Sequence, residues 1–467
     1  MNKAALATAS LAGIVTGVQA PSLSAKSGRE TGAKPNIVLI IGDDCRMRDL
    51  GCYGNAWTQT PNIDRLASEG LLFERFFQAT AMSSPTRQCL LTGLYPVRSG
   101  AYPNHTFIQP GVRTLPSYLK DCGYRVATQG KRHYAPLAQF PFEYLDPMNQ
   151  GNAPLNPGRV EPFLRDVAAS GEPFFLYLCS TDPHSPWTRG DQSLFDPDRI
   201  VLPENLVDTP QTRRQYCDYL AEINLLDKHV GMIDAMLEKY GLTENTIFIF
   251  TSEQGYSFPF AKWTLYDEGL QTGFIVRWPG VIKAGSRTAE MCEYVDITPT
   301  LIDIAGGKRV EGLDGRSFKK ILLGRGKGKK QVYGIHTSRG IIAGPEHYGI
   351  RSVRDGRYLY IRNLTPEARF HCAAFRDLFF QSWEAIADSN AFAARQVERY
   401  AVRPAEELYD VQADPFQQHN LAGEKASART LAKMRRLLDD WMERQGDKGQ
   451  ETEMDAFQHM AAKMGVK

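Results

Sequence analysis

The chain is organised around the stretch Ser83-Ser84-Pro85-Thr86-Arg87-Gln88-Cys89-Leu90-Leu91-Thr92-Gly93. Pro85 suits the first turn of a helix, and Leu90 and Leu91 are spaced to bury the far side of that helix. Ser83 then lies at the helix N-terminus, where free N–H groups and the helix dipole favour an anion. Arg87 lies one turn further on and can point back at the same place. The stretch therefore predicts a site for a tetrahedral oxyanion, with an ordinary capped helix as the alternative.

Apolar runs and helical patterns alternate along the chain on either side of this stretch. Continuous apolar runs predict buried strands at residues 36–42, 124–128, 173–179, 246–251 and 274–278. From Tyr216 to Leu237 apolar residues recur every three or four positions, which predicts a long amphipathic helix. Thr60 and Pro61 predict the start of another helix, with Thr60 as its cap. We therefore expect an α/β fold with a mostly parallel central sheet that helices cover on both faces.

Polar side chains follow the predicted strands at the point where each strand ends. They are Asp43, Asp44, Lys131, His133, His184, Glu253 and Gln254. In open α/β sheets this edge is where ligands bind. The pairs Asp43-Asp44 and Glu253-Gln254 offer oxygen ligands, which suit Ca²⁺ or Mg²⁺ better than Zn²⁺. A helix cap or solvated turn is the alternative for the first pair, and an ordinary loop is the alternative for the second.

The stretch from Ser83 to Gly93 also resembles the sulfatase signature, in which Cys or Ser is followed by x-Pro-x-Arg and then by x-x-Leu-x-Thr-Gly. In that family the first residue is oxidised to formylglycine (3-oxoalanine), the catalytic nucleophile, so the resemblance implies this modification at Ser83. Thr86 stands where the family usually has Ser. The resemblance also implies an alkaline-phosphatase-like sandwich with a small C-terminal α+β subdomain.

Further segments resemble the sulfatases in the family's order, over most of residues 35–425. Sulfatases bind one divalent metal, usually Ca²⁺, through two Asp residues after the first strand, formylglycine, and a late Asp-Asn or Asp-His pair. The resemblance thus implies one divalent metal, with Mg²⁺ as the alternative to Ca²⁺, and the ligands Asp43, Asp44, Ser83, Glu253 and Gln254. Glu253-Gln254 departs from the family pattern, and the extra methylene of Glu requires the metal or the loop to shift.

A cationic set resembles the sulfate-binding groups of the same family. Gly130-Lys131-Arg132-His133 resembles its Gly-Lys-x-His motif, Pro183-His184 its second active-site His, and Lys262 its sulfate-binding Lys. The catalytic residues that the resemblance implies are Ser83, Arg87, Lys131, His133, His184 and Lys262. Taken alone, each His would more often be a surface or core imidazole.

The implied reaction is the hydrolysis of a sulfuric ester or a sulfamate. One hydroxyl of the hydrated aldehyde from Ser83 attacks sulfur, while the metal, Arg87, Lys131 and Lys262 offset the negative charge. His184 protonates the leaving group, and His133 then deprotonates the remaining hydroxyl so that sulfate is expelled.

The substrate is expected to be a sulfated carbohydrate. Lys262 follows Gln254 by only eight residues, and this spacing, Phe258-Pro259 and the Pro136 that follows the Gly-Lys-x-His motif resemble the heparan N-sulfatase branch. That branch cleaves the N-sulfate of a terminal glucosamine in glycosaminoglycan degradation. His105 and Asp182 lie in loops expected to line the sugar pocket. The open alternatives are an O-sulfatase, a phosphatase or phosphonate hydrolase of the same superfamily, and a non-catalytic glycan binder with Ser83 unmodified.

The remaining segments predict location and domain organisation. Lys3 and the apolar residues 4–18 predict a signal peptide at 1–20, followed by a flexible leader at 21–34. A short membrane anchor is the alternative, and we expect no stable membrane span and a periplasmic or secreted protein. The expected domains are catalytic at 35–318 and C-terminal at 332–467, joined by a basic, glycine-rich linker at 319–331, and a hairpin is predicted at 348–361.

Composition points to the partners. The net charge of +2 gives no strong field toward nucleic acid, so none is expected as a partner. The expected partners are the sulfated saccharide and a separate formylglycine-generating enzyme of the serine type. Eight cysteines without CxxC spacing predict no particular disulfide.

Overall fold

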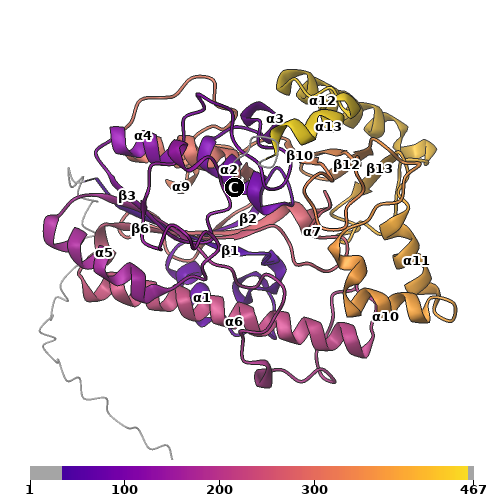
Figure 1. The fold of residues 1–467 in the computed structure, drawn as a ribbon, viewed down its shortest axis with the longest axis horizontal. Helices are drawn as coiled ribbons and strands as arrows, with labels where there is room; N and C mark the ends of the chain where they lie inside the picture. The colour runs from indigo at the N-terminus through magenta and orange to yellow at the C-terminus, as the bar shows by residue number, and fades with distance from the viewer. Residues whose placement is uncertain (1–33, 461–467) are drawn as a thin grey trace, which may run out of the picture. The chain divides into compact units, whose positions relative to one another are not determined.

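The computed structural model describes residues 34–460, whose helices and strands are arranged as in Figure 1. The strands of the large sheet are β1 (Asn36–Asp43), β2 (Leu71–Phe77), β3 (Arg125–Gly130), β4 (Glu143–Tyr144), β5 (Phe174–Cys179), β6 (Thr246–Glu253), β7 (Gln271–Arg277), β8 (Ser286–Thr288) and β9 (Cys292–Glu293). A smaller sheet consists of β10 (Val332–His336), β11 (Ile350–Arg354), β12 (Tyr358–Asn363) and β13 (Glu406–Asp410).

The helices fall into two groups along the chain. Those up to the middle of the chain are α1 (Pro61–Glu69), α2 (Ser83–Thr92), α3 (Pro96–Ser99), α4 (Leu115–Asp121), α5 (Pro157–Ser170), α6 (Pro210–Lys239) and α7 (Asp267–Leu270). The later ones are α8 (Ile297–Ile304), α9 (Lys319–Leu322), α10 (Leu378–Ile386), α11 (Ala391–Ala401), α12 (Ala428–Gln445) and α13 (Gln450–Met454).

The large sheet has the order β4-β3-β5-β1-β6-β7-β2-β8, with β9 beside β2. Its centre, β3-β5-β1-β6, is parallel, which confirms the predicted mostly parallel sheet. The predicted strand at 274–278 is β7, but it runs antiparallel to both β6 and β2. The strand β2 was not predicted from the sequence, and its pairing with β7 is interrupted by an irregularity between Phe73 and Phe76. The parallel core brings the carboxyl ends of four strands to one edge.

Both faces of this sheet are buried, which explains why its strands read as continuous apolar runs. On β1, Val38 and Ile40 belong to the core that contains α1, α5 and α6. Ile37 and Leu39 belong to the opposite core, with Leu90 of α2 and residues of α4 and α8. Figure 1 shows α1, α5 and α6 along one face of the sheet and α2 and α4 along the other. The sandwich expected from the sequence is therefore present.

The start of α1 is explained only in part by the local pattern. Thr60 is the N-cap residue and Pro61 is the first helical residue, as predicted, but the Thr60 side chain makes no capping hydrogen bond, and its hydroxyl instead accepts a hydrogen bond from the Gly51 N–H at 2.9 Å. The N–H groups of Asn62 and Ile63 donate to Asp227 Oδ1 at 3.0 and 2.8 Å. The predicted cap position is therefore confirmed, but a carboxylate from α6, far along the chain, satisfies these N–H groups in place of the Thr60 hydroxyl.

The C-terminal sheet joins the same body. It is antiparallel in the order β10-β11-β12-β13, and β11 and β12 form the predicted hairpin. Ile350 and Leu359 on one face belong to the core of α1, α5 and α6. Val353 and Tyr360 on the other face pack with residues of α12. The α+β character expected for this part of the chain is confirmed.

The segment 319–331 is anchored at both ends. It contains α9, and Lys329 Nζ lies 2.5 Å from Glu293 Oε2 and 3.0 Å from Asp296 Oδ1. Its use as a domain boundary stays a prediction. The predicted signal peptide and all of the leader except Lys34 lie outside the described residues. Within residues 34–460, no helix combines the length and the apolar character needed to cross a bilayer.

Candidate active site

The candidate site lies where the central strands end. Asp43, the last residue of β1, is in register with Glu253, the last residue of β6. The Asp43 N–H donates to the Asp182 carbonyl at 3.0 Å, and the Lys131 N–H donates to the Cys179 carbonyl at 3.0 Å. The parallel register therefore brings segments from four strands to one place, as the sequence predicted.

Ser83 occupies the first position of α2, next to the strand ends. Its Oγ lies 3.3 Å from Asp43 Oδ1, 3.4 Å from Lys131 Nζ and 3.0 Å from Gln254 Nε2. Ser83 is only 4% exposed, but it lines a cavity. A small hydroxyl thus lies between a carboxylate, an ammonium and an amide at a helix N-terminus, where the dipole favours negative charge.

Two lysines pair with the two buried carboxylates beside Ser83. Lys131 Nζ lies 2.6 Å from Asp43 Oδ2, and Lys262 Nζ lies 2.6 Å from Asp44 Oδ2. Burial alone would raise the pKa of Asp43, but the charges of Lys131, His184 and Arg87 hold it well below its usual value. Burial would also raise the pKa of Asp44, but the nearby charges, chiefly that of Lys262, outweigh it and the pKa is lowered. Both carboxylates therefore stay ionised.

Arg87 is fully buried and points back toward the strand ends, as expected from its place on α2. Its Nη2 lies 2.5 Å from Glu253 Oε2 and 3.7 Å from Asp43 Oδ1, and its Nη1 donates to the Lys131 carbonyl at 3.1 Å. Burial raises the pKa of Glu253 to about 7, although Arg87 acts to lower it. The longer Glu253 side chain thus reaches the guanidinium group.

The oxygens around Ser83 fit a hard divalent cation. Gln254 Nε2 donates to Asp44 Oδ1 at 2.7 Å, and this leaves Gln254 Oε1 buried with no hydrogen-bond partner among the described residues. Asp43, Asp44 and this amide oxygen form the donor set that Ca²⁺ and Mg²⁺ prefer. Across residues 34–460, no three His, Cys, Asp or Glu side chains are already grouped as a metal site. The fit therefore depends on the amide oxygen of Gln254.

The two histidines named from the sequence have different partners. His184 Nδ1 lies 2.6 Å from the Ser185 carbonyl, so it carries the proton and leaves Nε2 as the acceptor, 3.0 Å from Lys262 Nζ. The charge of Lys262 lowers the pKa of His184. His133 Nε2 lies 3.0 Å from His105 Nδ1, and burial lowers the pKa of His133 well below its usual value. The ring of His133 thus contacts His105, and both residues line the same cavity as Ser83.

Backbone strain is concentrated at this site. Eight non-glycine residues in the described part of the chain have a positive φ, and five of them belong to the site or its cavity. They are Asp44, His105, His133, Gln254 and Trp263. Residues other than glycine adopt this conformation at a cost of about 1–3 kcal/mol, and they do so mainly at functional sites.

The cavity above Ser83 has a volume of about 590 Å³, within the usual range of ligand pockets. His105 lines it, as predicted. Asp182 also borders it but is fully buried, and its carboxylate is held by Arg189 and Ser180. Arg189 and Asp377 also line the cavity but were not predicted, because the loops that carry them contain no motif.

The family model described as Sulfatase matches residues 35–307. The chain belongs to the sulfatase family. A second model, described as N-sulphoglucosamine sulphohydrolase, C-terminal, matches residues 253–370 of this sulfatase. The protein is therefore a sulfate ester or sulfamate hydrolase, in a family that generally depends on formylglycine and a divalent metal.

Individual relatives agree with the family assignment. An ulvan-active sulfatase of Formosa agariphila is 32% identical over 418 residues, which cover 89% of this sulfatase and 81% of the relative. Human N-sulphoglucosamine sulphohydrolase is 27% identical over 464 residues, which cover 88% and 90% of the two chains. A protein solved in complex with its substrate D-glucosamine-2-N,6-O-disulfate has a TM-score of 0.71 at 21% identity, covering 89% of this sulfatase and 99% of that chain. The alkaline-phosphatase-like fold is confirmed.

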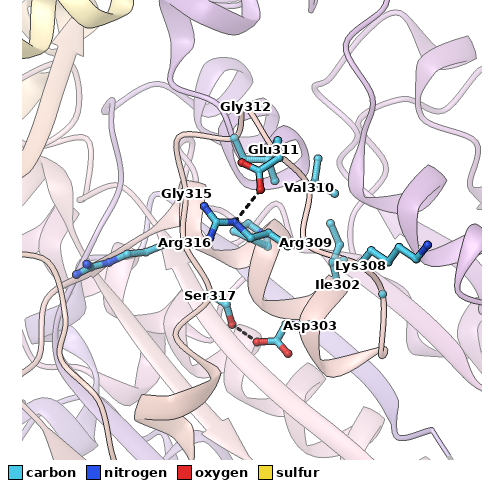
Figure 2. A pocket seen from close by; sticks show the side chains of 13 residues that line it. Ile302, Asp303, Lys308, Arg309, Val310, Glu311, Gly312, Gly315, Arg316 and Ser317 are labelled. Atoms are coloured by element: carbon cyan, nitrogen blue, oxygen red, sulfur yellow. Dashed lines mark hydrogen bonds and ion pairs between the residues drawn. The ribbon is translucent and has the colours of Figure 1, made fainter.

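The sulfatase has another pocket of about 640 Å³, between α8 and the loop at 307–317 (Figure 2). Its charged groups do not converge. Arg309 pairs with Glu311 at 3.2 Å, Ser317 donates to Asp303 at 2.6 Å, and Arg316 points away from both pairs. No residue of the proposed catalytic set lines this pocket, so size alone does not mark the active site.

Proposed function

We propose that this sulfatase is exported and hydrolyses the N-sulfate of glucosamine in heparan or heparin, with formylglycine made from Ser83 as the nucleophile. The observation that carries the sulfate chemistry is the environment of Ser83 Oγ, which lies within 3.4 Å of Lys131 Nζ at the N-terminus of α2. The match of residues 253–370 to the C-terminal model of N-sulphoglucosamine sulphohydrolase supports the N-sulfate as the substrate group.

The protein groups around Ser83 provide the charge that the reaction needs. When formed, formylglycine supplies a hydrated aldehyde as the nucleophile. Arg87, Lys131 and Lys262 lie against buried carboxylates and offset the charge of the sulfate and of the transition state. Because the site is desolvated, each of these cations acts more strongly than it would in water.

The two histidines move protons. His184 Nε2, which the Ser185 carbonyl keeps unprotonated in the neutral ring, takes up the proton that the attacking hydroxyl loses and passes it to the leaving nitrogen or oxygen. His133 removes the proton whose loss expels sulfate, and this requires its ring to turn from His105 toward Ser83. A divalent cation, Ca²⁺ with Mg²⁺ as the alternative, would be held by Asp43, Asp44 and Gln254, together with Glu253 and the modified Ser83, and would add electrostatic stabilisation.

An O-sulfated glycan is the second candidate substrate. It is favoured by the 32% identity to an ulvan-active sulfatase. It is also favoured by Glu253, which stands where the family pattern has Asp and pairs with Arg87. A panel of N-sulfated glucosamine, 6-O-sulfated glucosamine, galactose 6-sulfate and a sulfated aryl ester separates the two. Release of sulfate only from O-sulfated sugars would contradict the N-sulfate proposal and leave the sulfatase intact.

The state of Ser83 is tested by mass spectrometry of its peptide. We expect the loss of two hydrogens, or the hydrate of that product, when the protein is produced with a formylglycine-generating enzyme of the serine type. An unmodified Ser83 in protein that releases sulfate would overturn the nucleophile assignment. Unmodified protein that binds sulfated glycans without turnover would point instead to a binding protein.

Export is tested by fractionation of cells. We expect the mature chain in the periplasm or outside the cell, without its first 20 residues. Mature protein in the cytosol that still carries Met1 and Lys3 would contradict the proposal.

A further inference from the structure

We propose that Arg189 forms a second anion-binding subsite in the cavity, for a carboxylate or a second sulfate on the same saccharide whose scissile sulfate lies at Ser83. This inference rests on the proposed function, because it assigns a substrate class to the same cavity. The proposed catalytic residues bind only the scissile sulfate, whereas this subsite calls for a substrate with a second negatively charged group.

Arg189 is held in place by groups behind it. Its Nη1 donates to the buried carboxylate of Asp182 and to Thr181 Oγ1 at 3.0 Å. Its backbone N–H donates to Glu222 Oε1 at 2.9 Å. The guanidinium group is therefore oriented from one side only, and it lines the cavity with 37% of its side chain exposed.

The second edge of the guanidinium group carries the Nε and Nη2 donors. Among the described residues, neither Nε nor Nη2 of Arg189 makes a hydrogen bond or an ion pair. These two N–H edges form a planar fork, which matches the two oxygens of a carboxylate or sulfate. A guanidinium group with one edge fixed and the other open is prepared for such a ligand, since little side-chain entropy remains to be lost.

The loop that carries Arg189 is rigid. The backbone of Gly190 lies so close to α6 that a Cβ there would meet the Ala221 carbonyl carbon at 2.3 Å. Trp187 Nε1 donates to the Pro183 carbonyl at 2.8 Å, and the Trp187 ring stacks on Phe258 with ring centroids 5.2 Å apart. The loop is thus fixed on both sides of the residue that lines the cavity.

The same loop connects the two anion sites. His184, which contacts Lys262 at the sulfate end, and Arg189 both line the cavity and are five residues apart. At about 3.5 Å per residue, their backbones are separated by at most ~18 Å. The cavity of about 590 Å³ contains both groups, so one saccharide can reach both.

The test compares Arg189→Gln with the unchanged enzyme on substrates with one and two anionic groups. Gln keeps hydrogen-bond donors for Asp182 and Thr181 but removes the charge. The singly charged substrate is glucosamine 2-N-sulfate, and the doubly charged ones are glucosamine 2-N,6-O-disulfate and an N-sulfated glucosamine–uronate disaccharide. A charge-assisted pair is worth about 1.5–3 kcal/mol, so we expect kcat/KM for one of the doubly charged substrates to fall roughly 10- to 100-fold more than for the singly charged one.

The pattern of loss identifies the anion. A selective loss on the disulfate assigns a second sulfate, and a selective loss on the disaccharide assigns a carboxylate. Equal losses on all three substrates would overturn the proposal, because they would show a structural effect. Arg316→Gln, the same change in the pocket of Figure 2, is the control and should leave all three rates unchanged.

A binding measurement separates this inference from the proposed function. Titration calorimetry on Ser83→Ala protein, with and without Arg189→Gln, measures affinity for the three saccharides without turnover. A weaker affinity for a doubly charged saccharide alone supports the subsite even if no sulfate is released from any substrate. If Arg189→Gln does not fold, Arg189→Lys serves instead, since it keeps the charge but loses the fork and should show a smaller loss in the same direction.

Discussion

Two pockets of similar size in this sulfatase differ in how their charges are arranged. In the cavity above Ser83, Lys131 and Lys262 lie 2.6 Å from carboxylates that are almost completely buried. In the pocket at 302–317, Arg309 and Glu311 form an ion pair whose side chains are 86% and 81% exposed. Water screens the second pair and not the first, so only the first pocket can use its charges to bind an anion strongly.

The largest expected effect on turnover comes from a Ser→Ala substitution, which can be made in both pockets. Ser83→Ala should lower turnover by a factor on the order of a thousand or more, because it removes the proposed nucleophile. Ser317→Ala in the other pocket should change turnover by less than about twofold, since its exposed hydroxyl donates to Asp303 and accepts from the Lys319 N–H, and neither group belongs to the proposed catalytic set. Sulfate release by both variants is measured on one substrate. Near-normal release by Ser83→Ala would place the chemistry elsewhere.

Removal of divalent metal should have the next largest effect. A chelator should abolish activity, and Ca²⁺ or Mg²⁺ should restore it better than Zn²⁺, because the proposed ligands are oxygens. The same ions should raise the melting temperature of the chelated protein, since a ligand that binds only the folded state stabilises it. Better rescue by Zn²⁺ would favour the phosphatase alternative.

Leu90→Ala tests whether α2 supports the site through its buried face. Leu90 is fully buried on the side of α2 that packs against the sheet, so its truncation should cost about 2–5 kcal/mol of unfolding free energy. Denaturant unfolding measures this cost. The folded fraction should keep its KM, since Leu90 touches no group at Ser83, and a large change in KM without loss of stability would show that the two faces of α2 are coupled.

The smallest expected effect concerns Glu222, behind the cavity wall. Burial raises the pKa of Glu222 to about 7, although the N–H groups of Arg189 and Thr188 act to lower it. A carboxyl group whose pKa is about 4.5 in the unfolded chain and about 7 in the folded protein makes the folded state less stable as the pH rises from 4.5 to 7. Glu222→Gln does not have this loss, so the unfolding free energy of the variant minus that of the unchanged protein should be larger at pH 7.5 than at pH 4.5. Urea unfolding at both values measures this, and a difference independent of pH would contradict it.

Much of the fold followed from local patterns. Continuous apolar runs predicted β1, β3, β5 and β6, because both faces of these strands are buried and most of their side chains are therefore apolar. The strand β2 was missed, since its run is broken by Glu74 and Arg75 at the irregularity in its pairing. The antiparallel direction of β7 was not predicted, because direction depends on the partner strands and not on composition.

The candidate site likewise has parts that the sequence predicted and parts that only the structure shows. Residues directly after strands, such as Asp43 and Lys131, were named correctly as neighbours because parallel strands bring their carboxyl ends together. The partner of Glu253 was not named, since only the structure shows that its carboxylate reaches Arg87. The contact of His133 with His105 was not named either, since the motif around Lys131 does not indicate it.

By itself, the sequence determined the family motif at Ser83, the order of the buried strands along the chain and the polar residues at their ends. These features depend on residues that are neighbours in sequence, where periodicity and spacing can be read directly. Only the tertiary structure decided that Asp227 caps α1, that Arg87 pairs with Glu253 and that Arg189 lines the cavity. Each of these three features depends on groups that are far apart in the chain or on how a side chain packs. Burial and the energy between charges depend on distances in space, which the sequence does not give.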